Sequence, residues 1–214
     1  MGKYKRIGGK EKEMEKLPGS FYLRRNVLHV ARDLLGKIVI TNKDGIITSA
    51  RIVETEAYAG VLDRASHAFG ARRTNRNEVM YGDGGRAYIY LCYGIHHLFN
   101  VVTNVEGIPH AVLVRAAEPI LGIEVMLERS GKQKLDKTLT RGPGNFSRAL
   151  GIYTSDNGIA LDSKVLSIVD DGFKFPRRDI HASPRIGVDY AGVDAQLPYR
   201  FYIKGHPNVS GKPA

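Results

Sequence analysis

The clearest helical pattern of hydrophobic positions lies near the start of the chain. Apolar side chains recur at helical spacing over residues 27–35, Asn26 stands before them as a helix-capping residue type, and Gly36 follows as a residue type that ends helices. This pattern predicts an amphipathic helix that buries one face. Two further helices are predicted over residues 119–129 and 143–150, each with a proline in its first turn.

Alternating and β-branched runs predict the strands of a sheet. The turn sequence Lys43-Asp-Gly45 joins a strand at residues 37–41 to a long one at 46–58, which predicts a hairpin. Further strands are predicted at residues 86–93, 97–104, 110–117, 165–169, 184–190 and 199–204. Because short turns join neighbouring strands, we expect a largely antiparallel sheet with helices packed on it, a mixed α/β fold of the α+β kind.

The chain divides into a short arm and one domain. Residues 1–17 are rich in Lys and Glu and end before Pro18-Gly19, which predicts a flexible basic arm. The remaining residues, 18–214, fit one domain better than two and contain no internal repeat. Residues 60–85 are loop-rich and predict at most one helical turn.

The net charge of +10 is carried in patches. Residues 64–86 hold five arginines against two carboxylates, and residues 129–148 hold six lysines and arginines against Asp136 alone. A surplus of this size favours a polyanionic partner, most simply nucleic acid, over a role in solubility alone.

Composition also limits the location of the protein in the cell and the kinds of site that it can contain. The charged N-terminus and the lack of a long apolar run predict an intracellular protein with no membrane contact, in the cytoplasm or nucleoid of a bacterium or the nucleus of a eukaryote. The single cysteine, Cys92, is predicted at a buried strand position and cannot form an internal disulfide. A metal hydrolase that uses His67, His96, His97 and His110 is disfavoured, because no His-Glu-x-x-His pattern occurs and adjacent strand residues face opposite sides.

The strand at residues 51–58 carries candidate chemistry. Glu54, Glu56 and Tyr58 share one face if this run is extended. Such a face suits the wall of a pocket in which the ring holds a flat ligand, although a solvated edge strand with a surface tyrosine is the alternative. Arg115 follows the apolar run Val112-Leu-Val114 and needs a partner, for which Glu56 is one candidate, either in a structural ion pair or in a site where both hold a water.

A second candidate feature is the tight turn at Tyr93-Gly94. A large amphipathic ring at the tip of a hairpin, beside a basic loop, is suited to enter a duplex where a base has left the stack. The alternative is a turn tyrosine that packs on its own hairpin.

Several short motifs in the same order and nearly the same spacing carry a family resemblance. From about Leu17 to Ser210 the chain resembles the alkyladenine (3-methyladenine) DNA glycosylases of the mammalian type. The motifs are Arg51-Ile-Val-Glu-Thr-Glu-Ala-Tyr58, His67, Thr74-Asn-Arg-Asn77, Tyr88-Ile-Tyr90, Tyr93-Gly94, Asn100, Leu113-Val-Arg-Ala-Ala-Glu-Pro119, Arg141-Gly-Pro143 and Arg200-Phe-Tyr-Ile-Lys-Gly205.

The resemblance implies a single domain around a curved antiparallel sheet with a protruding hairpin, and no metal or cofactor. It implies a monomer that flips alkylated or deaminated purines out of double-stranded DNA and excises them. Such lesions include 3-methyladenine, 7-methylguanine, hypoxanthine and ethenoadenine. The competing interpretation is a non-catalytic nucleic-acid-binding module, which would explain the charge but not a buried pair of Glu56 and Arg115.

Residue roles follow from the same resemblance. It implies that Glu56 is the general base, that Arg115 and the backbone carbonyl of Ile186 help to hold the attacking water, and that Tyr93 fills the vacated stack. The groups that it implies around the flipped base are Tyr58, His67 and Tyr90, with Asn100 discouraging guanine. The family pattern is not complete, since Ile95-His96 replace larger or sulfur-containing side chains beside the wedge and Asn75 stands where proline is common.

Two expectations come from the chemistry. Glu54 would disfavour ionisation of Glu56 if both were buried, so Glu54 should point to an arginine or a backbone amide. No lysine lies among the matched pocket residues, which favours simple hydrolysis without strand cleavage. Phosphate contacts are predicted for Arg141, Lys132 and Lys134.

Overall fold

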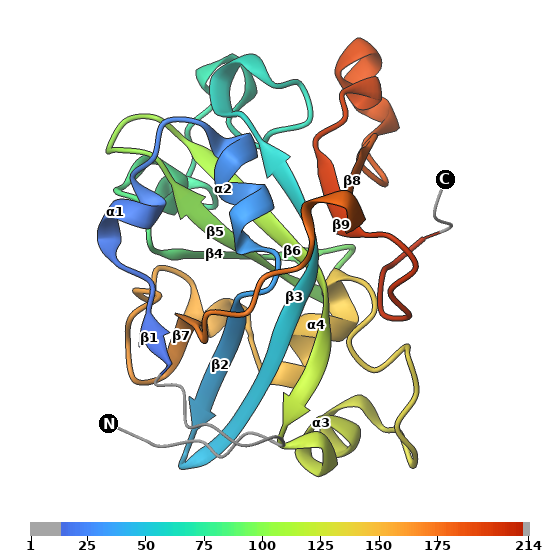
Figure 1. Ribbon diagram of the computed structural model, residues 1–214. Helices are drawn as coiled ribbons and strands as arrows, with labels where there is room; N and C mark the ends of the chain where they lie inside the picture. The colour runs from blue at the N-terminus through green and yellow to red at the C-terminus, as the bar shows by residue number, and fades with distance from the viewer. Residues whose placement is uncertain (1–13, 212–214) are drawn as a thin grey trace.

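The computed structural model describes residues 14–211, and the described chain folds around one curved sheet (Figure 1). The strands are β1 (Glu15–Lys16), β2 (Ile38–Lys43), β3 (Ile46–Tyr58), β4 (Ala87–Cys92), β5 (His96–Thr103), β6 (His110–Leu121), β7 (Leu166–Asp170), β8 (Ile180–Ser183) and β9 (Arg200–Ile203). The α-helices are α1 (Gly19–Tyr22), α2 (Val27–Leu34), α3 (Ile123–Ser130) and α4 (Pro143–Leu150). Short 3-10 turns occur at Gly60–Leu62, Phe69–Ala71, Glu78–Tyr81, Thr154–Asp156, Arg177–Asp179 and Asp189–Gln196.

Every strand pairing in the described chain is antiparallel, which confirms the predicted fold class. The strand order is β1-β7-β2-β3-β6-β5-β4, and β9 joins β3 and β8. The long strand β3 is central, because β6 pairs along one edge while β2 and β9 share the other edge. The hairpin predicted for β2 and β3 is present and turns at Asp44 and Gly45, both with positive φ.

Helices cover both faces of the sheet. In Figure 1, α2 lies on the front of the sheet beside β3, and α4 lies behind β3 and β6. Helix α2 begins as predicted, since the Asn26 side chain accepts from the backbone N–H groups of Leu28 and His29. Its buried residues Val27, Val30, Ala31 and Leu34 enter the main core, where Phe99 of β5 stacks on Phe146 of α4 with ring centroids 6.2 Å apart.

The predicted helix at residues 119–129 starts later than expected. Strand β6 continues through Leu121, and α3 begins only after Gly122. Pro119 is tolerated in a strand because β6 is paired here with β3 alone, so the missing N–H costs no ladder bond. Gly122 has a φ of 76°, and a Cβ there would lie 2.5 Å from the Ile47 carbonyl oxygen, so the turn requires glycine.

The predicted strand at residues 184–190 is wrong. Strand β8 ends at Ser183, and residues 184–188 form a loop before the 3-10 segment Asp189–Gln196. Pro184 cannot donate a ladder hydrogen bond, Gly187 has a φ of 76°, and the N–H of Ile186 is directed to a side chain of β3.

The predicted arm of residues 1–17 lies partly outside the described residues, which begin at Met14. Glu15 and Lys16 pair with Asp170 and Val169 of β7, and Leu17 is buried in the core. The folded part of the chain therefore begins before the boundary that the sequence predicts at residue 18.

Candidate active site

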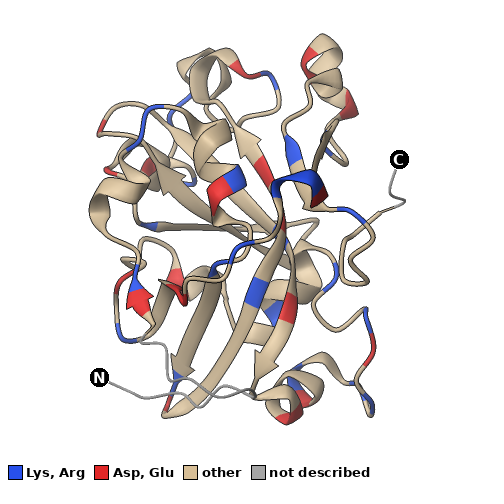
Figure 2. Cartoon of the chain, viewed as in Figure 1, with Lys and Arg blue, Asp and Glu red and all other residues tan. Residues whose placement is uncertain are grey.

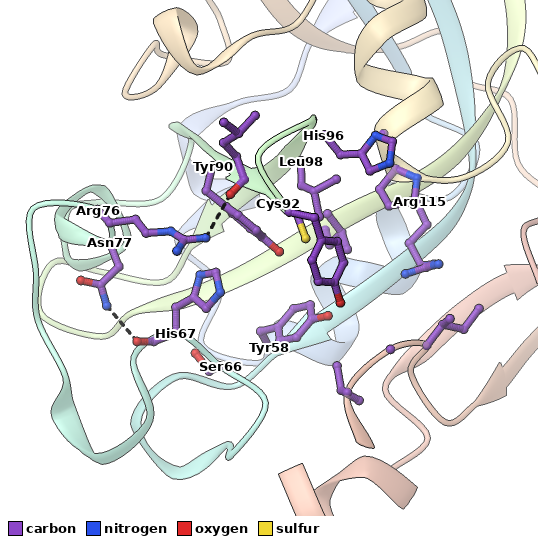
Figure 3. Close-up of a pocket in the computed structure, with 18 of the residues that line it drawn as sticks. Tyr58, Ser66, His67, Arg76, Asn77, Tyr90, Cys92, His96, Leu98 and Arg115 are labelled. Atoms are coloured by element: carbon purple, nitrogen blue, oxygen red, sulfur yellow. Dashed lines mark hydrogen bonds between the residues drawn. The ribbon is translucent and has the colours of Figure 1, made fainter. Parts of the chain in front are cut away.

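A cavity of about 890 Å³ opens beside the end of β3. Its walls come from β3, β6, the loops of residues 64–77, the β4–β5 hairpin, the start of α4 and the loop at residues 186–190 (Figure 3). Six predicted site residues line it: Tyr58, His67, Tyr90, Tyr93, Arg115 and Ile186. Cys92, predicted to be buried, lines it as well and is partly exposed, because it lies where β4 leaves the sheet for the hairpin tip.

Irregular pairing between β3 and β6 orients the charged side chains. Ile52 pairs with Ala117 and Glu54 with Ala116, which leaves Val53 without a partner, and the next pair, Thr55 with Val114, leaves out Arg115. Bulges of this kind turn a side chain away from the regular alternation of a strand. They bring Arg115 beside both Glu54 and Glu56 of the neighbouring strand.

The Glu54 carboxylate is fully buried and saturated with donors. Its Oε1 accepts from Arg200 Nε at 2.7 Å, Arg115 Nε at 3.2 Å and the Ser210 hydroxyl at 3.0 Å, and its Oε2 accepts from the Ser210 N–H at 2.6 Å. The prediction that Glu54 points to an arginine or a backbone amide is confirmed. Glu54 is therefore committed to holding β9 and the C-terminal segment against β3.

The Glu56 carboxylate is equally buried, but its donors belong to the cavity wall. Its Oε1 accepts from the Ile186 N–H at 2.8 Å and lies 3.2 Å from Arg115 Nη1, and its Oε2 accepts from the Tyr58 hydroxyl at 2.9 Å. An ionised carboxylate can accept about four hydrogen bonds, and these three leave room for one more. The predicted pairing of Arg115 with Glu56 is confirmed.

The charge states of this cluster favour hydrogen-bond donation to Glu56. Burial alone would lower the pKa of Arg115, but the carboxylates of Glu56 and Glu54 raise it overall, so the guanidinium stays charged. Burial, and then the charge of Glu56, raise the pKa of the Tyr58 hydroxyl well above its usual range. Tyr58 therefore remains a protonated donor.

Aromatic rings form one side of the cavity (Figure 3). The rings of His67 and Tyr90 meet edge to face with centroids 4.6 Å apart, and His67 Nδ1 lies 2.8 Å from the Tyr88 hydroxyl. Burial, assisted by the positive charges of Arg76 and Arg72, lowers the pKa of His67 to about 4. His67 is therefore a neutral ring at neutral pH.

Arg76 supports this aromatic wall and was not among the predicted site residues. Its guanidinium lies 4.9 Å from the centroid of the Tyr90 ring, and its Nη2 donates to the Leu91 carbonyl at 3.4 Å. The Thr74-Asn-Arg-Asn77 motif could have predicted these contacts of Arg76, because an arginine next to asparagines in a loop is a candidate for contacts with rings or carbonyls.

Tyr93 lies at the tip of the β4–β5 hairpin and is 89% exposed. Its φ is 50° and that of Gly94 is 72°, and the Ile95 N–H donates to the Cys92 carbonyl across the turn. The alternative of a tyrosine packed on its own hairpin is therefore wrong. Leu91 and Ile95, also exposed, flank the ring in the sequence and give the tip an apolar surface.

Asn100 occupies a different position from the other predicted base-contacting residues. It is buried, and its amide group donates to the carbonyls of Tyr88 and Leu98, each at 3.1 Å. Leu98 lines the cavity, as does Leu113, which pairs with Asn100 across β5 and β6, but Asn100 is not among the described lining residues. Its effect on guanine remains a prediction, as does the role of the Ile186 carbonyl, since the contact seen at Ile186 is made by the N–H.

The predicted phosphate-binding residues differ in their present contacts. Arg141 donates to the Gly211 carbonyl at 2.9 Å, and Lys132 Nζ contacts the carboxylate of Asp136 at 3.1 Å and the hydroxyl of Thr138 at 2.6 Å. Lys134 is exposed. Figure 2 shows Lys and Arg with an acidic residue along this segment between α3 and α4.

Three of the four histidines considered for a metal site have separate hydrogen-bond partners. His67 contacts Tyr88, His97 accepts from the Thr154 N–H, and His110 lies 3.1 Å from the Asn104 amide nitrogen. Within residues 14–211, no group of three or more His, Cys, Asp or Glu side chains is arranged to hold a metal ion. In the same part of the chain, no helix has the length and apolar character needed to cross a membrane.

Sequence comparison agrees with this geometry. A family model described as methylpurine-DNA glycosylase (MPG) matches residues 20–207. The chain belongs to the methylpurine-DNA glycosylase family. A protein of Bacillus cereus (strain G9842) named "Putative 3-methyladenine DNA glycosylase" is 47% identical over 203 residues, which cover 91% of this chain and 98% of the relative. A Bacillus thuringiensis (strain Al Hakam) protein of the same name is 46% identical with the same coverage.

Family membership makes this protein a DNA repair glycosylase, with DNA as its substrate. The resemblance predicted from the motifs is confirmed at the level of the family. Its qualifier "mammalian type" is not supported, because these relatives are bacterial. The sequence did not reveal four further buried polar residues beside these groups, namely Arg200, Ser210, Asp63 and Arg185, each of which has one partner more than 90 positions away in the chain.

Proposed function

We propose that this glycosylase hydrolyses the N-glycosidic bond of alkylated or deaminated purines in double-stranded DNA, after flipping the damaged nucleotide into the cavity. The observation that carries the proposal is Glu56, a fully buried carboxylate whose hydrogen-bond and ion-pair partners all line one cavity. A buried carboxylate with an open acceptor position, beside rings that can hold a flat base, suits removal of a proton from water.

In this proposal the flipped base stacks among Tyr58, His67 and Tyr90. The neutral His67 ring suits bases that carry a positive charge after alkylation, because an imidazolium would repel them. As the bond to the sugar breaks, the sugar gains oxocarbenium character, which the negative Glu56 stabilises while it accepts a proton from the attacking water. Arg115 and the Ile186 carbonyl hold that water.

We also propose that the reaction stops at an abasic site. A glycosylase that cleaves the strand uses an amine nucleophile, and the described residues that line the cavity include arginines but no lysine. Tyr93 fills the gap in the stack, and Arg141, Lys132 and Lys134 contact phosphates. We further propose that the protein acts as a monomer.

The decisive experiment compares the wild type with Glu56→Gln. Duplexes that contain hypoxanthine, ethenoadenine or a methylated purine are incubated under single-turnover conditions, and abasic sites are revealed by alkaline cleavage. We expect the wild type to release base and Glu56→Gln to release none, with affinity for lesion DNA within roughly tenfold, because the amide keeps the shape of the side chain but accepts no proton. A variant with a rate near that of the wild type would assign the base to another residue.

The same assay tests the alternative of a binding module. A wild-type protein that binds lesion duplexes without releasing base from any of them would support that alternative. Strand cleavage without alkali would contradict the proposed simple hydrolysis.

A further inference from the structure

We propose that the buried ion pair of Asp63 and Arg185 positions two hydrogen-bond donors on Glu56. Those donors are the Tyr58 hydroxyl and the Ile186 N–H, which approach the two oxygens of the carboxylate separately. The inference rests on the proposed function, since it assigns Asp63 and Arg185 a role in the same site.

The pair is bidentate and almost completely buried. Arg185 Nη1 donates to Asp63 Oδ2 at 2.6 Å and Arg185 Nη2 donates to Asp63 Oδ1 at 2.8 Å, and the two side chains are 0% and 2% exposed. Asp63 also accepts from the N–H groups of Ala59 and Ala65. The carboxylate therefore fixes the loop that follows β3 while it holds Arg185.

Arg185 connects this loop to both donors. Its guanidinium donates to the Ala57 carbonyl at 2.9 Å, between Glu56 and Tyr58, and lies 4.8 Å from the centroid of the Tyr58 ring. Its backbone continues directly into Ile186, whose N–H reaches Glu56. One side chain thus restrains the ring of one donor and the backbone of the other.

Stability alone is a weak explanation for this arrangement. A buried ion pair often contributes little compared with apolar side chains of the same volume, because both charges lose their hydration. Among the described residues, Arg185 Nε has no hydrogen-bond partner although it is buried, which lowers the stabilising value further. The loops at residues 59–65 and 184–188 lie outside the strands. The ion pair therefore fixes the positions of two loops that the hydrogen bonds of the sheet do not hold.

The test compares Asp63→Asn with Asp171→Asn. Asp171 forms a similar bidentate buried pair with Arg51, at 3.1 and 2.9 Å, which joins the residue after β7 to the part of β3 that precedes Glu56 and so controls for the loss of a buried charge. We expect Asp63→Asn to lower the single-turnover excision rate by about 10- to 100-fold, the range produced by small misplacements of reacting groups, with lesion affinity changed less than threefold. Asp171→Asn should leave the rate within twofold, both variants being assayed below their melting transitions.

A double-mutant cycle with Tyr58→Phe separates positioning from general damage. If Asp63 acts through the Tyr58 hydroxyl, Asp63→Asn should cost at least threefold less in the Tyr58→Phe background, whereas Asp171→Asn should have the same effect in both backgrounds. If Asp63→Asn does not fold, Arg185→Lys takes its place, because one ammonium cannot make both contacts. Equal losses in the two backgrounds, or a normal rate in Asp63→Asn, would overturn the inference. Failure of the proposed function would instead appear as activity in Glu56→Gln.

Discussion

Two glutamates two positions apart on one strand have different roles because their partners differ. Glu54 is held by two arginines and by the hydroxyl and N–H of Ser210, whereas Glu56 receives one hydroxyl, one backbone N–H and one shared arginine. Saturation leaves Glu54 with a structural role. Glu56 has three partners, all of which line the cavity, one fewer than an ionised carboxylate can accept, and is therefore the candidate base.

At the residue scale, the lowered pKa of His67 predicts how the free energy of unfolding depends on pH. Its pKa is about 4 in the folded protein against 6.5 in a model peptide, so the unfolded chain binds more protons between these values. The free energy of unfolding therefore rises with pH in this window: the contribution of His67 is complete above pH 6.5 and is lost as the pH falls toward 4. His67→Gln should lose less stability than the wild type over this window.

The measurement is urea unfolding at a series of pH values for both proteins. His110 and His206, whose pKa values burial also lowers, are unchanged in the variant, so only the difference between the two curves reports on His67. Parallel curves would contradict a neutral, buried His67.

At the scale of elements, the site depends on irregularities within otherwise regular strands. The bulges of β3 and β6 bring Arg115 to the carboxylates, and β9 occupies the edge of β3 that β2 leaves free beyond Arg51. The β4–β5 hairpin extends Tyr93 away from the core with a left-handed turn. Each element thus provides one part of the proposed site: the candidate base, the aromatic wall or the proposed wedge.

The exposed position of Tyr93 on the hairpin predicts that its substitution weakens DNA binding without lowering the stability of the fold. Tyr93→Ser should weaken binding to lesion duplexes by on the order of 1–3 kcal/mol, because the ring would no longer fill the vacated stack. Its melting temperature should equal that of the wild type, since the side chain is 89% exposed. Tyr88→Ser, at a position 2% exposed on the same strand, should instead lower the melting temperature. A large loss of thermal stability in Tyr93→Ser would mean that the ring packs on the protein.

At the scale of the whole molecule, the net charge of +10 favours binding to DNA, but the lysines and arginines that carry the charge are not equivalent. The hydroxyl and N–H of Thr138, followed by Lys132, lower the pKa of Asp136 to about 2, so Lys132 has an ionised partner at neutral pH. Lys134 is exposed in the same segment. Phosphate binding by Lys132 would compete with these contacts.

The prediction at this scale concerns salt dependence. Lys134→Ala should lower the slope of log affinity against log salt by about one unit on damaged and undamaged duplexes alike, because one phosphate contact fewer releases fewer counterions. Lys132→Ala should change the slope less. Arg115→Ala should leave the slope on undamaged DNA unchanged and abolish most excision.

Fluorescence anisotropy titrations over a range of salt concentrations measure the slopes, and single-turnover assays measure excision. If Arg115→Ala shows the larger change in slope with normal excision, Arg115 contacts the DNA backbone and does not act in the cavity.

The local patterns of the sequence were sufficient for most of the elements. The Asn26 cap, the Asp44-Gly45 turn and the alternation along β3 act through neighbours in the chain, so the residue types alone predict them. The failures fall where tertiary contacts override local preference. Pro119 is accepted in β6 because one edge of that strand is unpaired there, and residues 184–188 leave the sheet because Arg185 and Ile186 bind Asp63 and Glu56.

The sequence by itself determined the family, the antiparallel architecture and the residue types of the site, because these depend on motif order, hydrophobic period and turn chemistry. The tertiary structure alone decided which glutamate is saturated with donors and which is the candidate base. That choice depends on Arg200 and Ser210, which lie 146 and 156 positions from Glu54 along the chain. The donors and charges within a few ångströms of a carboxylate determine its role. Separation along the chain does not predict which residues lie within that distance.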